Sequence, residues 1–282
     1  MSKQRTAACL LALLMSCNTS WSSTPQSGVR FKVIRESVIT VPVLVNGRGP
    51  FDFVFDTGTE SSLIDSRLAG ELKISPVDRV LLSNPGGEKA LLRGFADEIS
   101  LGSMNVLHSE VIIGDLAGLH ALNPHIRGII GQNVLSHFDY VIDYAHSLIR
   151  IASDSNPEET IQGTKMEMVR RHGCPIIVGR INKKSDLQLS LDSGSSHLVL
   201  YRSTVPASSR MVTAQMQSSS EAVQTGTVVV PQLELGDVSL WGLQTALVNK
   251  PQIQDIDGLI PTRLFSAVFV NNSQGYVIVR KR

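Results

Sequence analysis

Phe55-Asp-Thr-Gly-Thr59 and Leu191-Asp-Ser-Gly-Ser195 are two short stretches of one form, and their aspartates lie 136 residues apart. Each has an apolar residue, an aspartate, a hydroxyl residue and a glycine, and each follows an apolar run typical of a β-strand. A single Asp-[Ser/Thr]-Gly tripeptide is weak evidence, because about one chain in ten of this length contains one by chance. Two of them in matching contexts indicate that one structural unit occurs twice.

The surrounding sequence repeats in the same order. Leu101-Gly102 and Leu235-Gly236 lie 134 residues apart, and the glycines of Gly128-Ile-Ile130 and Gly258-Leu-Ile260 lie 130 residues apart. Short apolar and β-branched runs, separated by turns that contain Gly, Pro or Asn, dominate both halves. We therefore predict a mainly β fold made of two similar lobes.

This repeat and the composition of the remaining segments divide the chain into five predicted parts. Segments rich in Ser, Thr, Pro and Gly or poor in apolar residues are typical of tethers and linkers. The parts are a signal peptide at 1–17, a flexible tether at 18–30, an N-terminal β lobe at 31–152, a linker at 153–162 and a C-terminal β lobe at 163–282.

The N-terminus has the layout of a secretory signal peptide. Lys3 and Arg5 precede an apolar run of nine residues, Ala7 to Met15, which is too short to span a bilayer. Leu14-Met-Ser-Cys17 resembles the end of a lipoprotein signal, in which Cys17 would be acylated. The alternative is plain export with cleavage a few residues later. In either case we expect an exported protein of the periplasm or cell envelope, with a lipid anchor to the membrane if Cys17 is modified.

Composition and charge exclude several function classes. Hydrophobic residues make up 42% and charged residues 18% of the 282 residues, as in ordinary core-forming proteins. The formal net charge of +1 does not supply the basic field that a nucleic-acid partner requires. Cys174 is the one cysteine outside the N-terminal segment, so we expect no disulfide framework and interpret Cys174 as a buried structural thiol.

The two aspartate stretches, together with Ile129-Ile-Gly131, resemble the aspartic peptidase superfamily of pepsin and the retroviral proteases. The lead-in Val41-Pro-Val-Leu-Val-Asn-Gly-Arg-Gly-Pro-Phe51 looks especially like the bacterial retropepsin-like branch. The resemblance covers nearly the whole chain after the predicted tether. It implies a two-lobed, pseudo-twofold β-barrel architecture in one monomer, and an exported aspartic endopeptidase that takes a polypeptide as its substrate.

Asp56 and Asp192 are the candidate catalytic residues. Two carboxyl groups held close together cannot both ionise cheaply, so they share a proton, as the aspartic peptidase dyad itself illustrates. The ionised member can take a proton from a water molecule, and the protonated member can hydrogen-bond the carbonyl of the bond to be cleaved. This chemistry requires no metal, no cofactor and no covalent intermediate.

The residues after each aspartate are the candidate supports of the dyad. The resemblance implies that the hydroxyls of Thr57 and Ser193 hydrogen-bond across to the opposite loop. Gly58 and Gly194 fit a sharp turn, with backbone N–H groups aimed at carboxylate oxygens, where a Cβ has little room.

Two departures from the family pattern leave alternatives open. Leu259-Ile-Pro261 has a proline where the family has a glycine, and the predicted flap at 81–93, with its tip at Ser83–Gly87, contains no tyrosine. These departures motivate an alternative function, a catalytically inactive peptide-binding or inhibitory protein of the same fold. A glycosidase with two carboxylates is a further alternative, disfavoured by the flanking Thr, Ser and Gly. The seven histidines form no H-x-x-x-H pair, and neither a nucleotide-binding glycine loop nor a Gly-x-Ser-x-Gly motif is present.

Overall fold

The computed structural model describes residues 28–35, 38–84, 87–151, 161–181, 185–201, 212–217, 222–249 and 255–282. Several predicted features lie outside these residues: the signal peptide with Cys17, the tether up to residue 27, residues 153–160 of the linker, and residues 85–86 at the flap tip. Within the described residues, no helix combines the length and the apolar character that crossing a membrane requires.

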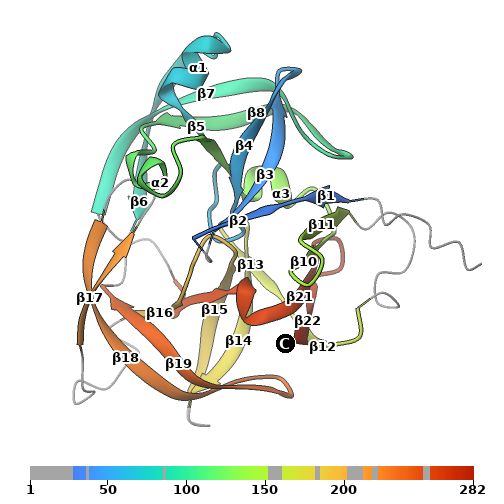
Figure 1. The fold of residues 1–282 in the computed structure, drawn as a ribbon, viewed down its shortest axis with the longest axis vertical. Coiled ribbons are helices and arrows are strands. Elements are labelled where there is room, and N and C mark those ends of the chain that lie inside the picture. Colours follow the sequence, from blue (N-terminus) through green and yellow to red (C-terminus); the bar gives the residue numbers. More distant parts are fainter. Residues whose placement is uncertain are drawn as a thin grey trace, which may run out of the picture.

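Strands dominate the structure, so the prediction of a mainly β fold is confirmed (Figure 1). Sheet one, in the upper half of Figure 1, has eight strands that all come from the first half of the chain. In spatial order they are β2 (Lys32–Ile34), β3 (Val38–Val45), β4 (Arg48–Phe55), β9 (Ile126–Ile130), β5 (Leu63–Asp65), β8 (Met104–Gly114), β7 (Gly87–Leu101) and β6 (Pro76–Asn84).

Sheet two, in the lower half of Figure 1, also has eight strands, all from the second half of the chain. In spatial order they are β13 (Val169–Arg171), β14 (Cys174–Ile181), β15 (Ser185–Asp192), β20 (Gly258–Pro261), β16 (Leu198–Tyr201), β19 (Val238–Val248), β18 (Ala222–Leu235) and β17 (Val212–Gln217).

The two sheets share one topology, strand for strand. In both, the strand before the aspartate is parallel to its neighbour, as β4 is to β9 and β15 is to β20. The pairing registers are equivalent too. Phe53 lies three residues before Asp56 and pairs with Gly128, and Leu189 lies three residues before Asp192 and pairs with Gly258. The spacings seen in the sequence therefore correspond to equivalent positions in two copies of one sheet.

The hairpin that leads to Asp56 shows how local sequence builds these sheets. Asn46 and Gly47 have φ values of 51° and 69°, the left-handed conformation that a two-residue hairpin turn requires. These two residues form the whole turn, and β4 already begins at Arg48. At its far end β4 becomes buried, from Phe53 to Phe55, where it enters the core.

The helices are few and short. Those within the described residues are α1 (Ser66–Glu71), α2 (Ala117–Leu122), α3 (Gln132–Leu135) and the 3-10 helix η2 (Thr262–Leu264). Helix α3 follows β9 and η2 follows β20, so both occupy the same place in their copy of the repeat.

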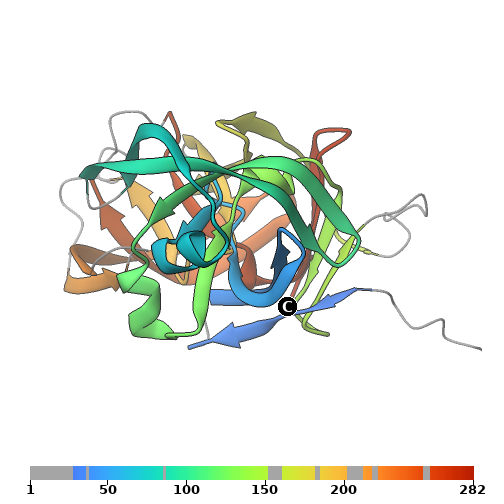
Figure 2. The same cartoon turned by 90° about the horizontal axis from the view of Figure 1, so that it is seen from above.

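A six-stranded sheet three joins the two halves. Its strands, in spatial order, are β1 (Val29–Arg30), β11 (Leu148–Ile151), β10 (Tyr140–Asp143), β21 (Phe265–Asn271), β22 (Tyr276–Lys281) and β12 (Thr164–Glu167). Figure 2 shows the molecule from above, with the blue to green strands of sheet one in front of the orange strands of sheet two. The predicted tether ends at residue 30, whereas Val29 and Arg30 already form β1. The predicted lobe boundaries themselves stay a prediction.

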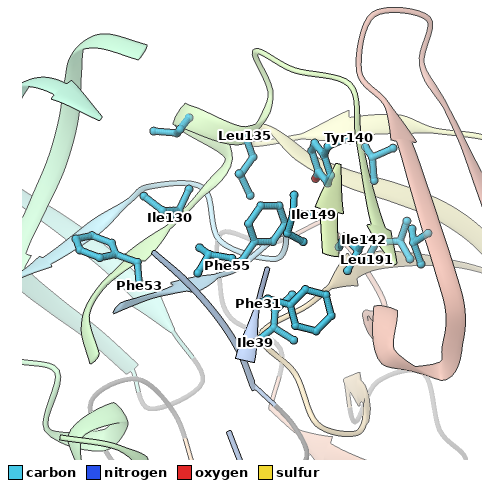
Figure 3. Close-up of a cluster of buried hydrophobic side chains, with 14 of the residues drawn as sticks. Phe31, Ile39, Phe53, Phe55, Ile130, Leu135, Tyr140, Ile142, Ile149 and Leu191 are labelled. Carbon is cyan, nitrogen blue, oxygen red and sulfur yellow. The ribbon is translucent and has the colours of Figure 1, made fainter. Parts of the chain in front are cut away.

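One hydrophobic core runs through both halves and sheet three. Figure 3 shows Phe55 from β4, Tyr140 and Ile142 from β10, and Leu191 from β15 gathered in one cluster. All four are buried, and the Tyr140 ring meets the Phe55 ring edge-on with 5.4 Å between centroids. The residues directly before both aspartates are thereby anchored in the same core.

Candidate active site

Asp56 and Asp192 lie at the ends of equivalent buried strands. Asp56 directly follows β4, and its backbone N–H donates to Ile130 O at 3.0 Å. Asp192 is the last residue of β15 and pairs with Pro261 of β20. The structure brings the two side chains together, close enough for a hydrogen bond between the carboxyl groups.

Four hydrogen bonds tie the two aspartate loops to each other. The Thr57 hydroxyl donates to Leu191 O at 2.8 Å, and the Ser193 hydroxyl donates to Phe55 O at 2.7 Å. Each hydroxyl also accepts from the backbone N–H of the other residue, at 3.0 Å in both directions. Thr57 and Ser193 are buried, so these bonds are shielded from water and hold both aspartates in one arrangement.

Gly58 and Gly194 leave room for the opposite carboxylate. A Cβ on Gly58 would lie 2.5 Å from Asp192 Cγ, and a Cβ on Gly194 would lie 2.7 Å from Asp56 Oδ2. The same glycines donate their N–H groups to their own aspartates, at 2.9 Å to Asp56 Oδ1 and 2.7 Å to Asp192 Oδ1. Each glycine therefore supports one carboxylate and makes space for the other.

The two carboxyl groups differ in their proton affinity. Burial, followed by the negative charge of Asp56, raises the pKa of Asp192 well above its ordinary value. Burial also raises the pKa of Asp56, and the hydrogen bond with Asp192 acts in the opposite direction. Backbone N–H groups lower the pKa of both carboxyl groups, those of Gly58 and Thr59 at Asp56 and those of Gly194 and Ser195 at Asp192. Asp192 is only 7% exposed, whereas Asp56 keeps partial access to solvent. The pair therefore shares one proton, and the stronger rise at Asp192 favours Asp192 as the member that carries it.

Buried neutral groups surround the dyad. The Cys174 thiol is buried, as predicted, and burial together with the charges of Asp56 and Asp192 raises its pKa. Burial also raises the pKa of Tyr140 and Tyr201, and it raises that of Tyr144 to about 12. These four side chains stay protonated at physiological pH, so Cys174 is not a nucleophile here.

Behind Asp56 lies a polar network that the sequence analysis did not identify. Gly131 N–H donates to Ser62 Oγ at 3.0 Å, and Ser62 Oγ donates to Asn133 Oδ1 at 2.8 Å. Gln132 is 1% exposed, and its Nε2 donates to Thr57 O at 2.8 Å. The polar pair Gln132-Asn133, directly after an apolar strand and a glycine, was the available sequence signal.

Pro261, the departure from the family pattern, is matched by a second change. Through the register of the sheets, Pro261 occupies the place of Gly131, and Leu198 occupies the place of Ser62. Proline lacks the N–H that Gly131 donates, and buried Leu198 lacks the hydroxyl that would accept it. Sheet two therefore lacks both the donor and the acceptor of the hydrogen bond that joins Gly131 to Ser62 in sheet one. Because neither partner is left unpaired, the change costs little stability.

A comparison with protein families agrees with this geometry. The family model described as aspartyl protease matches residues 41–134, which contain Asp56, the predicted flap and the Gly131 network. The resemblance to the aspartic peptidase superfamily is thereby confirmed. No curated protein matches the chain.

Proposed function

Because residues 41–134 match the aspartyl protease family, we propose that this protein is an aspartic endopeptidase that hydrolyses peptide bonds with water. The observation that carries the proposal is the pairing of the Asp56 and Asp192 carboxyl groups, whose loops are joined through the reciprocal hydrogen bonds of Thr57 and Ser193. Both aspartates come from one chain, so we propose that the monomer is the active form.

The proposed reaction uses the proton that the dyad shares. A water molecule between the carboxyl groups attacks the peptide carbonyl carbon as its proton passes to Asp56, while Asp192 gives its proton to the carbonyl oxygen. The resulting gem-diol then collapses: Asp56 passes its proton to the leaving nitrogen, the C–N bond breaks, and Asp192 recovers a proton from a gem-diol hydroxyl. Acid and base are both restored at the end.

Electrostatics supports this division of roles. Asp56 is the more exposed carboxyl group, and its pKa is the less strongly raised of the two, which suits a general base. Asp192 has the more strongly raised pKa, which suits a general acid at mildly acidic pH.

The alternative function, binding without cleavage, keeps the same fold and site. One of its two grounds, Pro261, is weakened because Leu198 has no hydroxyl that would need the missing N–H as a donor. The other ground, a flap without tyrosine, concerns the stretch around Ser83–Gly87, of which residues 85–86 lie outside the described residues. The cleavage assay separates the two functions directly.

The test is cleavage of a mixed peptide library between pH 3 and 7, read by mass spectrometry. We expect new peptide termini that are suppressed by a peptide analogue with a secondary alcohol in place of the scissile carbonyl, because this group imitates the gem-diol. Binding of the analogue without any cleavage at any pH would instead support the inactive binding protein.

We further propose that the protein is exported to the periplasm or cell envelope and anchored by a lipid on Cys17. Support comes from the sequence alone, from the short apolar run before Cys17 and the Ser- and Thr-rich stretch after it. Mass spectrometry of the N-terminal peptide from the protein's native host tests this. An unmodified peptide that begins after Cys17 would contradict the anchor and leave export intact.

A further inference from the structure

One peptide unit connects Gln132 to Asp56. The carbonyl of Thr57 accepts from Gln132 Nε2 at 2.8 Å, and the N–H at the other end of the same peptide, that of Gly58, donates to Asp56 Oδ1 at 2.9 Å. A donor at the carbonyl end polarises the peptide and strengthens the hydrogen bond at its N–H end. Gln132 thus acts on the Asp56 carboxylate without touching it.

The surroundings of Gln132 hold its amide in this orientation. Gln132 Oε1 and the Tyr140 hydroxyl are both buried and, in the described part of the chain, neither has a partner at good hydrogen-bond geometry. The Gln132 side chain is nevertheless close enough to lower the pKa of the Tyr140 phenol, against the larger effect of burial. An amide turned the other way would place Oε1 against Thr57 O, two acceptors in contact, so Nε2 has to face the carbonyl.

Sheet two lacks this amide donor at the equivalent position. By the strand registers, Thr262 occupies in sheet two the position that Gln132 occupies in sheet one. The Thr262 hydroxyl is hydrogen-bonded to the Tyr144 hydroxyl at 2.7 Å. The peptide that supports Asp192, between Ser193 and Gly194, therefore has a hydroxyl side chain behind it rather than an amide. The two otherwise similar aspartate loops differ at this point.

We infer that Gln132 is a positioning residue: it fixes the Thr57–Gly58 peptide and thereby makes Asp56, rather than Asp192, the carboxylate that stays ionised. Sheet geometry alone would make the two aspartates nearly equivalent, so an asymmetric support is needed to assign the roles of base and acid. The inference rests on the proposed function where it concerns catalysis, but the ionisation of Asp56 can be measured independently.

Other titratable groups around the dyad have to be considered in any pH measurement. Those that interact with the dyad or with its buried neighbours are Asp192, the Cys174 thiol, the phenols of Tyr140, Tyr144 and Tyr201, and the charged groups of Glu60, Arg170, Arg263 and Arg282. The thiol and the phenols stay neutral below pH 7, and the variants proposed below leave all of these groups in place.

The test compares Gln132→Met with Val134→Ala, a matched control in the same helix whose buried side chain belongs to the core. The profile of kcat/KM against pH is measured for both variants and the wild type on a peptide that the wild type cleaves. Carboxyl ¹³C signals of labelled aspartates are titrated in parallel, with Asp56→Asn and Asp192→Asn identifying the dyad signals.

In Gln132→Met we expect the acid limb of the profile and the Asp56 titration to move to higher pH. On that limb kcat/KM should fall about twofold, because losing the polarising donor weakens the hydrogen bond from Gly58 N–H to the Asp56 carboxylate without removing it. Val134→Ala should lower the melting temperature without moving either titration.

Equal pH behaviour of Gln132→Met and Val134→Ala would overturn the inference. If Gln132→Met does not fold, Gln132→Asn replaces it, because this side chain keeps the amide but is one methylene too short to reach Thr57 O. If the wild type cleaves no peptide, the proposed function fails, and the ¹³C titration still decides the role of Gln132.

Discussion

The hydroxyls of Thr57 and Ser193 each accept the other residue's backbone N–H, so neither aspartate loop can move alone. The Thr57 hydroxyl also donates to Leu191 O and the Ser193 hydroxyl to Phe55 O, the carbonyls directly before the two aspartates. Residues separated by 136 positions thus form one buried unit. This unit connects the stability of the protein to the geometry of the dyad.

Ser193→Ala should destabilise the protein by about 1–3 kcal/mol, because the buried Thr57 N–H loses its acceptor. Thr57→Val should cost a similar amount, and the double variant should cost less than the sum, since the two hydroxyls belong to one network. Urea denaturation measures all three. Ser190→Ala is the control, as Ser190 lies in β15, just before Ser193, and its buried Oγ has no hydrogen-bond partner among the described residues. Additive effects, or a Ser193 effect no larger than that of Ser190, would contradict the coupling.

Asp56→Asn and Asp192→Asn should each abolish peptide cleavage while the fold stays intact. Each change preserves the shape of the side chain but removes the base or the acid, and losing such a role costs a factor of about 10² to 10⁴ in rate. The double variant should be hardly worse than either single one, because the two carboxyl groups act as a unit. Peptide assays with circular dichroism check this, and a folded single variant with wild-type activity would refute the mechanism.

Stability should depend on pH through Asp192. Its pKa in the folded protein is raised, so between its ordinary value of about 4 and the folded value the folded state binds more protons than the unfolded state. The contribution to stability is therefore fully present at low pH and is lost as pH rises through the folded pKa.

Asp192→Asn should remove this dependence. Denaturation midpoints from pH 3.5 to 7 should show the wild type losing stability relative to the variant as pH increases. A constant difference over this range would show that the pKa of Asp192 is not raised in the folded protein.

Gly194→Ala should inactivate the enzyme with little loss of secondary structure. The added Cβ would lie 2.7 Å from Asp56 Oδ2, so the carboxylate has to move out of the plane of the dyad. Gly70→Ala is the matched control, because no atom of the described residues lies within 4 Å of its Cβ position in helix α1. That control should keep full activity and gain up to about 1 kcal/mol of stability. Normal kinetics for Gly194→Ala would contradict the observed packing of the loops.

Pro261 and Leu198 should behave as a compensated pair. Pro261→Gly alone creates an N–H opposite Leu198 and should cost about 1–3 kcal/mol, because a buried donor is left without an acceptor. Adding Leu198→Ser should recover part of this loss by recreating the arrangement of Gly131 and Ser62. Urea denaturation of the two single variants and the double variant measures the coupling, and simple additivity would show that the two positions are independent.

Much of the site could be predicted because its signals are local. An apolar strand that ends in Asp-[Ser/Thr]-Gly determines a sharp turn with N–H groups near the carboxylate, and its repetition predicted both aspartates, their glycines and the β class. The Gln132 amide behind Asp56 was not predicted, because its partner Thr57 O lies 75 residues away in the chain.

By itself, the sequence determined that this protein is mainly β, that its halves are similar, and that Asp56 and Asp192 occupy equivalent places. Only the tertiary structure decided what differs between these places. The Gln132 amide donates to Thr57 O, the Thr262 hydroxyl pairs with Tyr144, and Leu198 and Pro261 take the positions that Ser62 and Gly131 hold in sheet one. Tyr144 and Thr262 are 118 residues apart in the chain. The physical reason is that side chains behind a buried strand meet through sheet register and core packing, which no pattern within a single segment specifies.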